Sequence, residues 1–151
     1  MSAVAPAARP GRRWRPKRVV ATPAAYDHPH GLRIMARVEG LGLEVERLRS
    51  NRLTGVRGET ERETYARAKA TLAIVVSPPG RRRLQPIAPS ADWRFDLAEG
   101  CPAHCQYCYL AGSLSGPPVT RVYADLDEIL DNLAAYEGGG TVTSRRAARR
   151  E

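Results

Sequence analysis

The chain has 151 residues, which is long enough for one hydrophobic core. No apolar run reaches membrane-spanning length and the Ala/Pro/Arg-rich start lacks the apolar stretch of a signal peptide, so we expect a soluble, cytoplasmic protein. The net charge is +8, but the first 18 and the last seven residues contribute +6 and +3, which leaves −1 for residues 19–144. Charge alone therefore does not indicate a DNA-binding protein.

A basic tail precedes the first predicted element. Residues 1–16 hold too few periodic apolar residues to pack, and we expect them to be disordered. The apolar run at 19–21 stops at Pro23 and predicts a buried strand. Asp27 is suited to cap a helix whose apolar residues recur at helical spacing as far as Gly40.

Two more strands and a helix are predicted before residue 78. Residues 43–48 predict a less regular strand, and the β-branched run at 71–76 predicts a strand buried on both faces. Between them, Thr60 and Glu63 form a capping box that starts a helix. The alternation predicts a small β-α-β-α-β layer over residues 17–77, an α/β fold with parallel strands.

A linker rich in proline and arginine is predicted at residues 78–91. Beyond it, Trp93, Phe95 and Leu97 alternate with polar residues. This alternation predicts a strand with an apolar inner face that leads to Cys101.

A third helix is predicted after a loop rich in glycine and proline. Asp125 and Glu128 form a start like a capping box, and apolar residues follow on one helix face at Leu126, Ile129, Leu130, Leu133 and Ala134. Three glycines end this helix, and the basic residues 138–151 are expected to be disordered.

All three cysteines of the chain lie within eight residues, at Cys101, Cys105 and Cys108. An odd number of thiols cannot all pair, and so short a loop strains a disulfide. The C-x3-C-x2-C spacing therefore predicts a metal site, for which two metals are candidates. A zinc site needs a fourth ligand, whereas an iron–sulfur cubane held by three cysteines leaves one iron open to a small ligand.

Three histidines are available as a fourth zinc ligand. His104 lies between two of the cysteines and would be strained if it bound the same ion, which favours the iron–sulfur interpretation. His28 and His30 belong to the first turn of the first predicted helix, where surface or capping roles are the simpler explanation.

The sequence around the cysteines resembles a known family. An aromatic residue precedes the third cysteine, as in the radical S-adenosylmethionine (radical SAM) superfamily, and the stretches GCPAHCQYCYL and RVYADLDEIL closely resemble the spore photoproduct lyase family. The resemblance extends upstream through AKATLAIVV and more weakly to KRVVATP, so that it covers about residues 17–137.

This resemblance implies a fold and a chemistry. Residues 92–137 are expected to form the first βα unit of an incomplete radical SAM barrel of partial TIM type, with the cysteines at the C-terminal end of its strand. The implied cofactors are a 4Fe-4S cluster and S-adenosylmethionine, whose reductive cleavage gives a 5′-deoxyadenosyl radical. The implied partners are DNA that carries the thymine dimer formed in spores by ultraviolet light, and an external electron donor.

Two tyrosines receive roles from the same resemblance. Tyr107 matches an aromatic residue that approaches the adenine of the cofactor, and Tyr109 matches a tyrosine implicated in relaying a hydrogen atom near the substrate. The alternative for each is an ordinary packing role beside the cluster.

The length after Cys108 departs from the family. Only 43 residues follow, room for about one βα repeat, whereas a complete barrel takes roughly 200 to 250 residues. We therefore expect an N-terminal portion that is inactive alone and has no spare cysteine as hydrogen donor. The rival hypotheses are a small zinc-binding interaction module with basic tails for nucleic acid, and a radical SAM enzyme with a different substrate.

Overall fold

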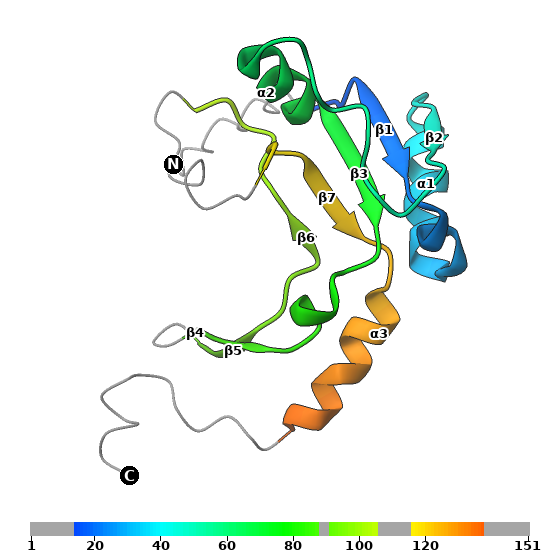
Figure 1. The fold of residues 1–151 in the computed structure, drawn as a ribbon. Coiled ribbons are helices and arrows are strands. Elements are labelled where there is room, and N and C mark those ends of the chain that lie inside the picture. The colour runs from blue at the N-terminus through cyan, green and yellow to red at the C-terminus, as the bar shows by residue number, and fades with distance from the viewer. Residues whose placement is uncertain (1–13, 88–90, 106–115, 138–151) are drawn as a thin grey trace, which may run out of the picture.

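The computed structural model describes residues 14–87, 91–105 and 116–137 (Figure 1). The predicted C-terminal tail and all but the last three residues of the predicted N-terminal tail lie outside the described residues. Two of those three residues contact the fold: Pro16 is buried, and the guanidinium of the exposed Arg15 donates a hydrogen bond to the carbonyl oxygen of Leu41 at 3.0 Å. In the described part of the chain, no helix is long and apolar enough to cross a membrane.

A five-stranded sheet forms the centre of the structure, in the order β2-β1-β3-β7-β6 (Figure 1). Its strands in chain order are β1 (Arg18–Ala21), β2 (Val45–Arg47), β3 (Thr71–Val75), β6 (Ala98–Glu99) and β7 (Thr120–Tyr123). The first three strands and β7 run parallel, and β6 pairs antiparallel with β7 at one edge. The prediction that 19–21, 43–48 and 71–76 form strands of one parallel sheet is confirmed.

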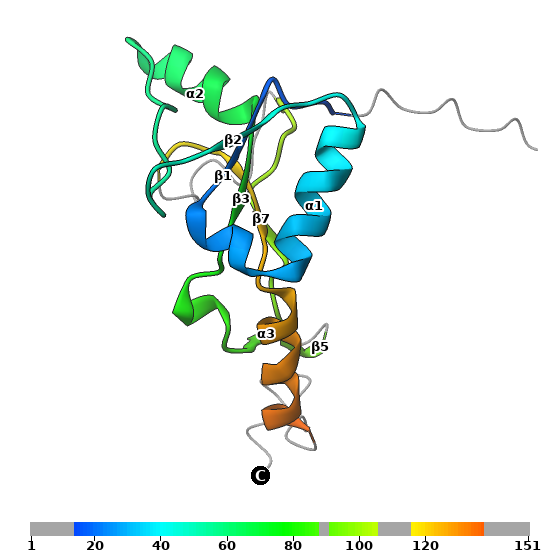
Figure 2. The same cartoon turned by 90° about the vertical axis from the view of Figure 1, so that its right-hand side faces the viewer.

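Helices cover both faces of this sheet (Figure 2). A short 3-10 helix, η1 (Pro23–Asp27), leads into α1 (Pro29–Gly40) on one face, and α2 (Glu61–Lys69) lies on the other. The crossover from β1 to β2 moves in one direction along the sheet, and the crossover from β2 to β3 moves in the other. Because crossovers of parallel strands are right-handed, this reversal places their helices on opposite faces.

Apolar side chains from alternate strand positions build a core on each face. The core beneath α1 contains Val19, Ala21, Ala25, Met35, Val38, Ile74 and Ala124. The core beneath α2 contains Val20, Leu48, Val56, Ala68, Ala73 and Val119. Burying a side chain such as Ile74 contributes about 1.5 to 3 kcal/mol, and burial on both faces explains why β3 is apolar along its length.

The two helix starts follow their sequence signals to different degrees. Thr60 is the N-cap of α2, and its hydroxyl accepts a hydrogen bond from the Glu63 N–H at 3.1 Å, as predicted. The Glu63 carboxylate reaches the N–H of Glu59 at 2.8 Å. The predicted cap at Asp27 is wrong, because that residue ends η1 and α1 begins after His28.

The chain between β3 and the cysteines contains more structure than predicted. Within the predicted linker lie a 3-10 helix, η2 (Pro79–Arg81), and strand β4 (Gln85–Ile87). β4 pairs antiparallel with β5 (Ala91–Arg94) in a second, two-stranded sheet. The domain boundary near residue 92 stays a prediction.

The single strand expected to carry the chain into the cysteines is wrong. β5 ends at Arg94 and β6 begins at Ala98, and the two strands belong to different sheets. Phe95 and Leu97 lie between them with 38% and 46% of their surface exposed. Alternating hydrophobicity reports which residues share a strand face, but here the chain changes its hydrogen-bonding partner midway through the pattern.

β7 is a strand that the sequence interpretation missed. It follows two prolines in what was predicted to be an irregular loop, yet it lies inside the sheet between β3 and β6. The structure therefore places a strand between the cysteine loop and the last helix, and the described residues form an open sheet. The partial barrel stays a prediction.

The last helix is confirmed in position. It consists of α3 (Leu126–Asp131), which continues as the 3-10 helix η3 (Asn132–Tyr136) and projects beyond the end of the sheet (Figure 1). Of the five apolar residues predicted on its inner face, only Ile129 is fully buried, and Leu130 is 42% exposed.

Candidate metal centre

The cysteine loop begins where β6 ends. β6 is antiparallel to β7, with Glu99 opposite Arg121. The chain therefore leaves β6 at the N-terminal edge of the parallel strands, which is the side of the sheet where β1, β3 and β7 begin. Cys101 is half-buried, Cys105 is exposed, and both are free thiols.

The structure places two of the five predicted site residues. Cys108, Tyr107 and Tyr109 lie outside the described residues. Among the residues that are described, no group of three His, Cys, Asp or Glu side chains forms a metal site.

Gly100 fixes the conformation with which the loop begins. Its φ of +91° lies in the region that side chains disfavour. A Cβ at this position would lie 2.4 Å from the carbonyl oxygen of Val119 and 3.1 Å from the Cα of Thr120. Glycine therefore allows the start of the loop to lie directly against the start of β7.

One face of α2 supports the loop from the other side. Tyr65 and Lys69 are four residues apart and so project from the same face of the helix. The Lys69 Nζ donates a hydrogen bond to the carbonyl oxygen of Cys101 at 2.6 Å. The Tyr65 ring meets the His104 ring edge-on, with 6.1 Å between the ring centroids.

Sequence reasoning missed both supporting residues. Lys69 is a charged residue at the end of a helix, where a solvated side chain that favours the helix dipole is the ordinary expectation. In the structure it is 2% exposed, and its ammonium binds the carbonyl oxygen of Cys101 at the start of the cysteine loop. Lys69 lies in the stretch AKATLAIVV, which contributed to the family resemblance but gave no sign of its contact with the loop.

The histidines weighed as zinc ligands lie in two different places. His104 is in the cysteine loop and packs against Tyr65. His28 precedes α1 at the opposite edge of the sheet, where its Nδ1 lies 3.8 Å from the Glu128 carboxylate. His30, in the first turn of α1, is also at that edge. This position excludes His28 and His30 as ligands of a metal ion bound by Cys101.

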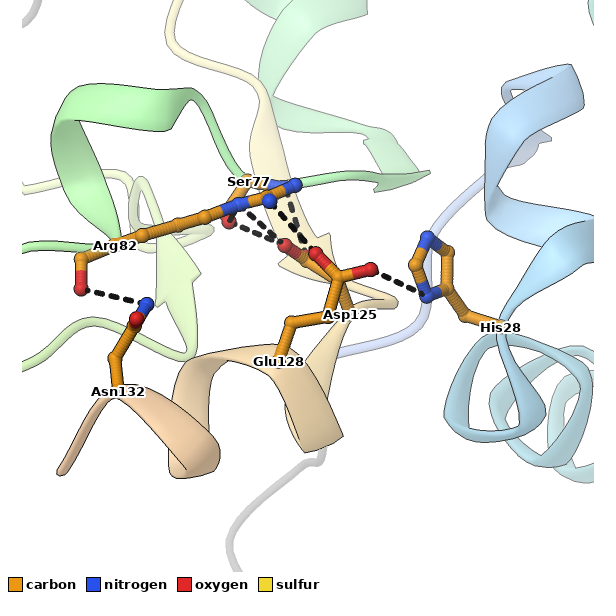
Figure 3. A network of polar contacts seen from close by, with 6 residues as sticks. All are labelled: His28, Ser77, Arg82, Asp125, Glu128 and Asn132. Atoms are coloured by element: carbon orange, nitrogen blue, oxygen red, sulfur yellow. Dashed lines mark hydrogen bonds and ion pairs between the residues drawn. The ribbon is translucent and has the colours of Figure 1, made fainter. Parts of the chain in front are cut away.

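A buried polar network occupies that opposite edge (Figure 3). The Asp125 carboxylate, which is fully buried, accepts hydrogen bonds from the Ser77 N–H at 2.8 Å and from the Ser77 hydroxyl at 2.5 Å. The Arg82 Nε lies 3.2 Å from the same carboxylate. Asp125 thereby joins the segment after β3 to the segment after β7.

The remaining members of the network extend it along α3. The Arg82 guanidinium forms a second ion pair with Glu128 at 2.6 Å, and Asn132 donates to the Arg82 carbonyl oxygen at 3.2 Å. Asp125 is the N-cap residue of α3, as predicted, but its side chain makes no cap bond because the carboxylate is occupied by Ser77 and Arg82.

A pocket of about 550 Å³ opens beside the start of β7. We call it the arginine pocket, and it is lined by Arg52, Leu53, Thr54, Gly55, Val56, Arg57, Pro117, Val119 and Arg121. No hydrogen bond or ion pair joins its three guanidinium groups to other residues within the described ranges. Val119 also contacts Gly100, so the pocket adjoins the cysteine loop.

Comparison with known proteins identifies the family. The family model for spore photoproduct lyase matches residues 14–146. The chain belongs to the spore photoproduct lyase family. The family resemblance seen around the cysteines is thereby confirmed, and it extends over both the sheet and the cysteine loop.

Two curated members of the spore photoproduct lyase family show how much of the enzyme these residues match. The spore photoproduct lyase of Geobacillus sp. (strain Y412MC61) is 38% identical over 124 residues, and that of Bacillus subtilis (strain 168) is 33% identical over 124 residues. Each match covers 80% of this chain and 35% of the relative. The chain thus spans about a third of the length of the curated relatives it matches.

Solved structures of the family share the fold. A spore photoproduct lyase complexed with dinucleoside spore photoproduct has a TM-score of 0.72 and 33% identity, covering 83% of this chain and 37% of that one. A mutant lyase with bound AdoMet, which is S-adenosylmethionine, and dinucleoside spore photoproduct gives the same values. The mixed α/β sheet described above is therefore similar to part of the spore photoproduct lyase structure.

Proposed function

We propose that this chain carries the cluster-binding part of a spore photoproduct lyase that cleaves S-adenosylmethionine reductively and repairs the thymine dimer of spore DNA. The observation that carries the proposal is the C-x3-C-x2-C motif in a chain of this family. Solved relatives complexed with AdoMet and with dinucleoside spore photoproduct support the cofactor and the substrate.

The donor chemistry fits an iron–sulfur cluster. Cys101 and Cys105 are free thiols on one loop, and thiolates at short spacings are the ligands of such clusters. Cys101, Cys105 and Cys108 would hold a 4Fe-4S cluster, which would supply an open iron for S-adenosylmethionine and one-electron chemistry. The residues of the chain hold the loop: Gly100 sets its entry and Lys69 binds its first carbonyl.

The two loop tyrosines have separate proposed roles. For Tyr107 we propose contact with the adenine of S-adenosylmethionine through its aromatic face. For Tyr109 we propose relay of a hydrogen atom near the substrate, because a phenoxyl radical is delocalised over the ring. Tyr109→Phe is expected to leave cluster content and cofactor binding unchanged and to lower the yield of repaired thymine in a repair-competent protein.

Repair by this chain alone is not part of the proposal. The relatives whose activity is repair match these residues over 35% of their length. We propose that the 151-residue chain loads a cluster but is inactive alone, because the cofactor and substrate sites of the family need further barrel strands. A fusion to the remaining part of the Bacillus subtilis enzyme should restore 5′-deoxyadenosine formation and repair of the dinucleotide photoproduct.

Anaerobic reconstitution with iron and sulfide tests the cluster. We expect about four iron and four sulfide per chain and a reducible cluster whose paramagnetic resonance spectrum changes on addition of S-adenosylmethionine. Replacing any one of the three cysteines by alanine should abolish this signal, and the chain has no other cysteine to substitute. A chain that instead takes up zinc stoichiometrically and forms no redox-active cluster would support the zinc-module rival.

The arginine pocket supports DNA as the partner. Three arginines, which form no ion pair with a described carboxylate, line this pocket beside the start of the cysteine loop. Arginine fits phosphate oxygens through paired N–H donors, and such contacts give affinity for a nucleic-acid backbone. We propose that this pocket holds the phosphate backbone beside the damaged dinucleotide.

Binding of a short DNA duplex at several salt concentrations tests this contact. Replacing the three pocket arginines by glutamine should weaken binding, and each lost phosphate contact should reduce the slope of log K against log salt by about 1. The matched control has the same change of charge at three exposed helix positions: Arg33, Arg37 and Arg62. Equal losses in both variants would mean that only net charge matters and would refute the pocket as the site.

A further inference from the structure

Lys69 is a buried cation that has no carboxylate partner among the described residues. It is 2% exposed, and its one hydrogen bond to a described residue goes to the Cys101 carbonyl oxygen at 2.6 Å. Its ammonium also faces the Tyr65 ring at 5.6 Å from the centroid. Lysine is almost never fully buried unless it is paired, because removing an ammonium from water is costly.

The choice of lysine at this position stands out in this sequence. The chain has 24 lysines and arginines, of which only Lys17 and Lys69 are lysines. Lys17 is exposed. The compact ammonium of Lys69 fits beneath the cysteine loop with a single carbonyl contact, whereas a guanidinium needs a wider set of acceptors.

The negative partner that the Lys69 ammonium lacks among the described residues would come from the loop that it contacts. Cysteine binds metal as a thiolate, so metal binding to the loop would place negative charge on Cys101, whose carbonyl oxygen accepts the hydrogen bond from Lys69. The reduction potential of an iron–sulfur cluster depends on its net charge, on its burial and on nearby hydrogen-bond donors. A fixed cation beside a ligand cysteine stabilises the more negative, reduced form.

We propose that Lys69 is a positioning residue of the cysteine loop, which fixes the loop through the Cys101 carbonyl and supplies the positive charge that balances its thiolates. Three contacts then define the start of the loop: Lys69 to Cys101, Tyr65 to His104, and Gly100 to β7. The part of the proposal that concerns charge rests on the proposed function, because it needs the cluster. The part that concerns loop position does not.

The loop position is tested in the metal-free 151-residue chain by amide hydrogen exchange. In Lys69→Met, exchange in the segment 101–105 should accelerate about tenfold, the loss expected for one hydrogen bond to a charged group. Exchange in β1 should be unchanged. Lys69→Arg keeps a charged donor, so its exchange rate in this segment should lie between those of the wild type and Lys69→Met. Lys17→Met is the matched control for loss of a lysine charge. Equal exchange in the wild type and Lys69→Met would overturn the positioning role.

The charge is tested after reconstitution with iron and sulfide, by redox titration of the cluster. We expect a more negative midpoint potential for Lys69→Met, and values close to the wild type for Lys69→Arg and Lys17→Met. A role confined to folding would change cluster content but not the potential of the clusters that form. An unchanged potential in Lys69→Met therefore overturns the charge role.

Two outcomes separate this inference from the proposed function. If the wild type takes up no cluster, the proposed function fails and the charge role falls with it, while hydrogen exchange still decides the positioning role. If the wild type loads a cluster and the Lys69 variants match it in both measurements, only the present inference fails. Should Lys69→Met not fold, Lys69→Gln, which keeps a neutral donor, takes its place in both tests.

Discussion

The N-terminal and C-terminal edges of the parallel strands each bury one charged side chain, and the partners of that side chain differ between the two edges. At the edge where the parallel strands end, the Asp125 carboxylate has a hydroxyl, a backbone N–H and a guanidinium as partners. At the edge where they begin, the partners of the Lys69 ammonium within the described ranges are one carbonyl oxygen and the face of a tyrosine.

This difference separates a structural contact from a functional one. A buried charge whose partners all belong to the fold strengthens that fold, and removing one partner is strongly destabilising. A buried charge with incomplete partners adds little stability and is free to serve a ligand that brings the opposite charge. We therefore expect the end of the sheet near Asp125 to determine stability and the end near Lys69 to determine cluster chemistry.

The largest effect is expected at Asp125. Asp125→Ala leaves the Ser77 N–H without an acceptor and Arg82 without its buried partner, which should cost about 3 to 5 kcal/mol in the free energy of unfolding. Urea unfolding followed by circular dichroism measures it. Asp127→Ala changes an exposed aspartate of the same helix and should stay within about 0.5 kcal/mol. Similar losses in both variants would contradict a structural role for the network.

Gly100→Ala should have the next largest effect. The positive φ and the contact of 2.4 Å with the Val119 carbonyl oxygen force the loop or β7 to move, at a cost of about 2 kcal/mol or more. Cluster uptake should fall with stability, since the loop loses its entry geometry. Gly80→Ala, where a Cβ meets no neighbour within 4 Å, is the control. A Gly100→Ala chain with wild-type stability and cluster content would show that the loop start is adaptable.

Lys69→Met should change the stability of the metal-free chain by no more than about 1 kcal/mol in either direction. Methionine has a similar volume, and replacing an incompletely paired buried charge by an apolar residue is often neutral or stabilising. Urea unfolding beside Asp125→Ala gives the direct comparison of the two edges. A loss as large as that of Asp125→Ala would show that Lys69 is a structural residue of the fold and nothing more.

The smallest effect is expected from two exposed carboxylates on the β2 and α2 side of the sheet. The hydrogen bond from Arg18 lowers the pKa of Glu46, and the backbone N–H of Glu59, followed by Arg67, lowers the pKa of Glu63. Because both folded pKa values lie below the ordinary 4.5, this stabilisation is complete above that pH and is lost as the pH falls through the lowered values.

The pH dependence of urea unfolding between about pH 6 and about pH 3 measures this contribution. The double variant Glu46→Gln and Glu63→Gln should show a flatter dependence than the wild type over that range. Its stability near neutral pH should be slightly lower, because surface pairs are worth little in water. An unchanged pH profile would mean that other carboxylates dominate acid unfolding.

Local signals were sufficient for the first half of the fold. The strands at β1, β2 and β3 and the start of α2 at Thr60 follow from short apolar runs and from a cap whose bond closes within three residues. The cysteine spacing and its surrounding motif likewise indicated the family, because metal ligands close together in sequence need no tertiary information to be recognised.

Tertiary structure alone decided β7, the break between β5 and β6, and the surroundings of the loop. β7 is a strand because β3 and β6 lie on either side of it, and the alternating residues before the cysteines divide between two sheets. Asp125 and Ser77 are 48 residues apart, and Lys69 and Cys101 are 32 apart. The first contact exists because the parallel strands β3 and β7 end side by side, and the second because the antiparallel strand β6 ends where the parallel strands begin. Burial there decides whether a charged side chain faces water, the fold or a ligand.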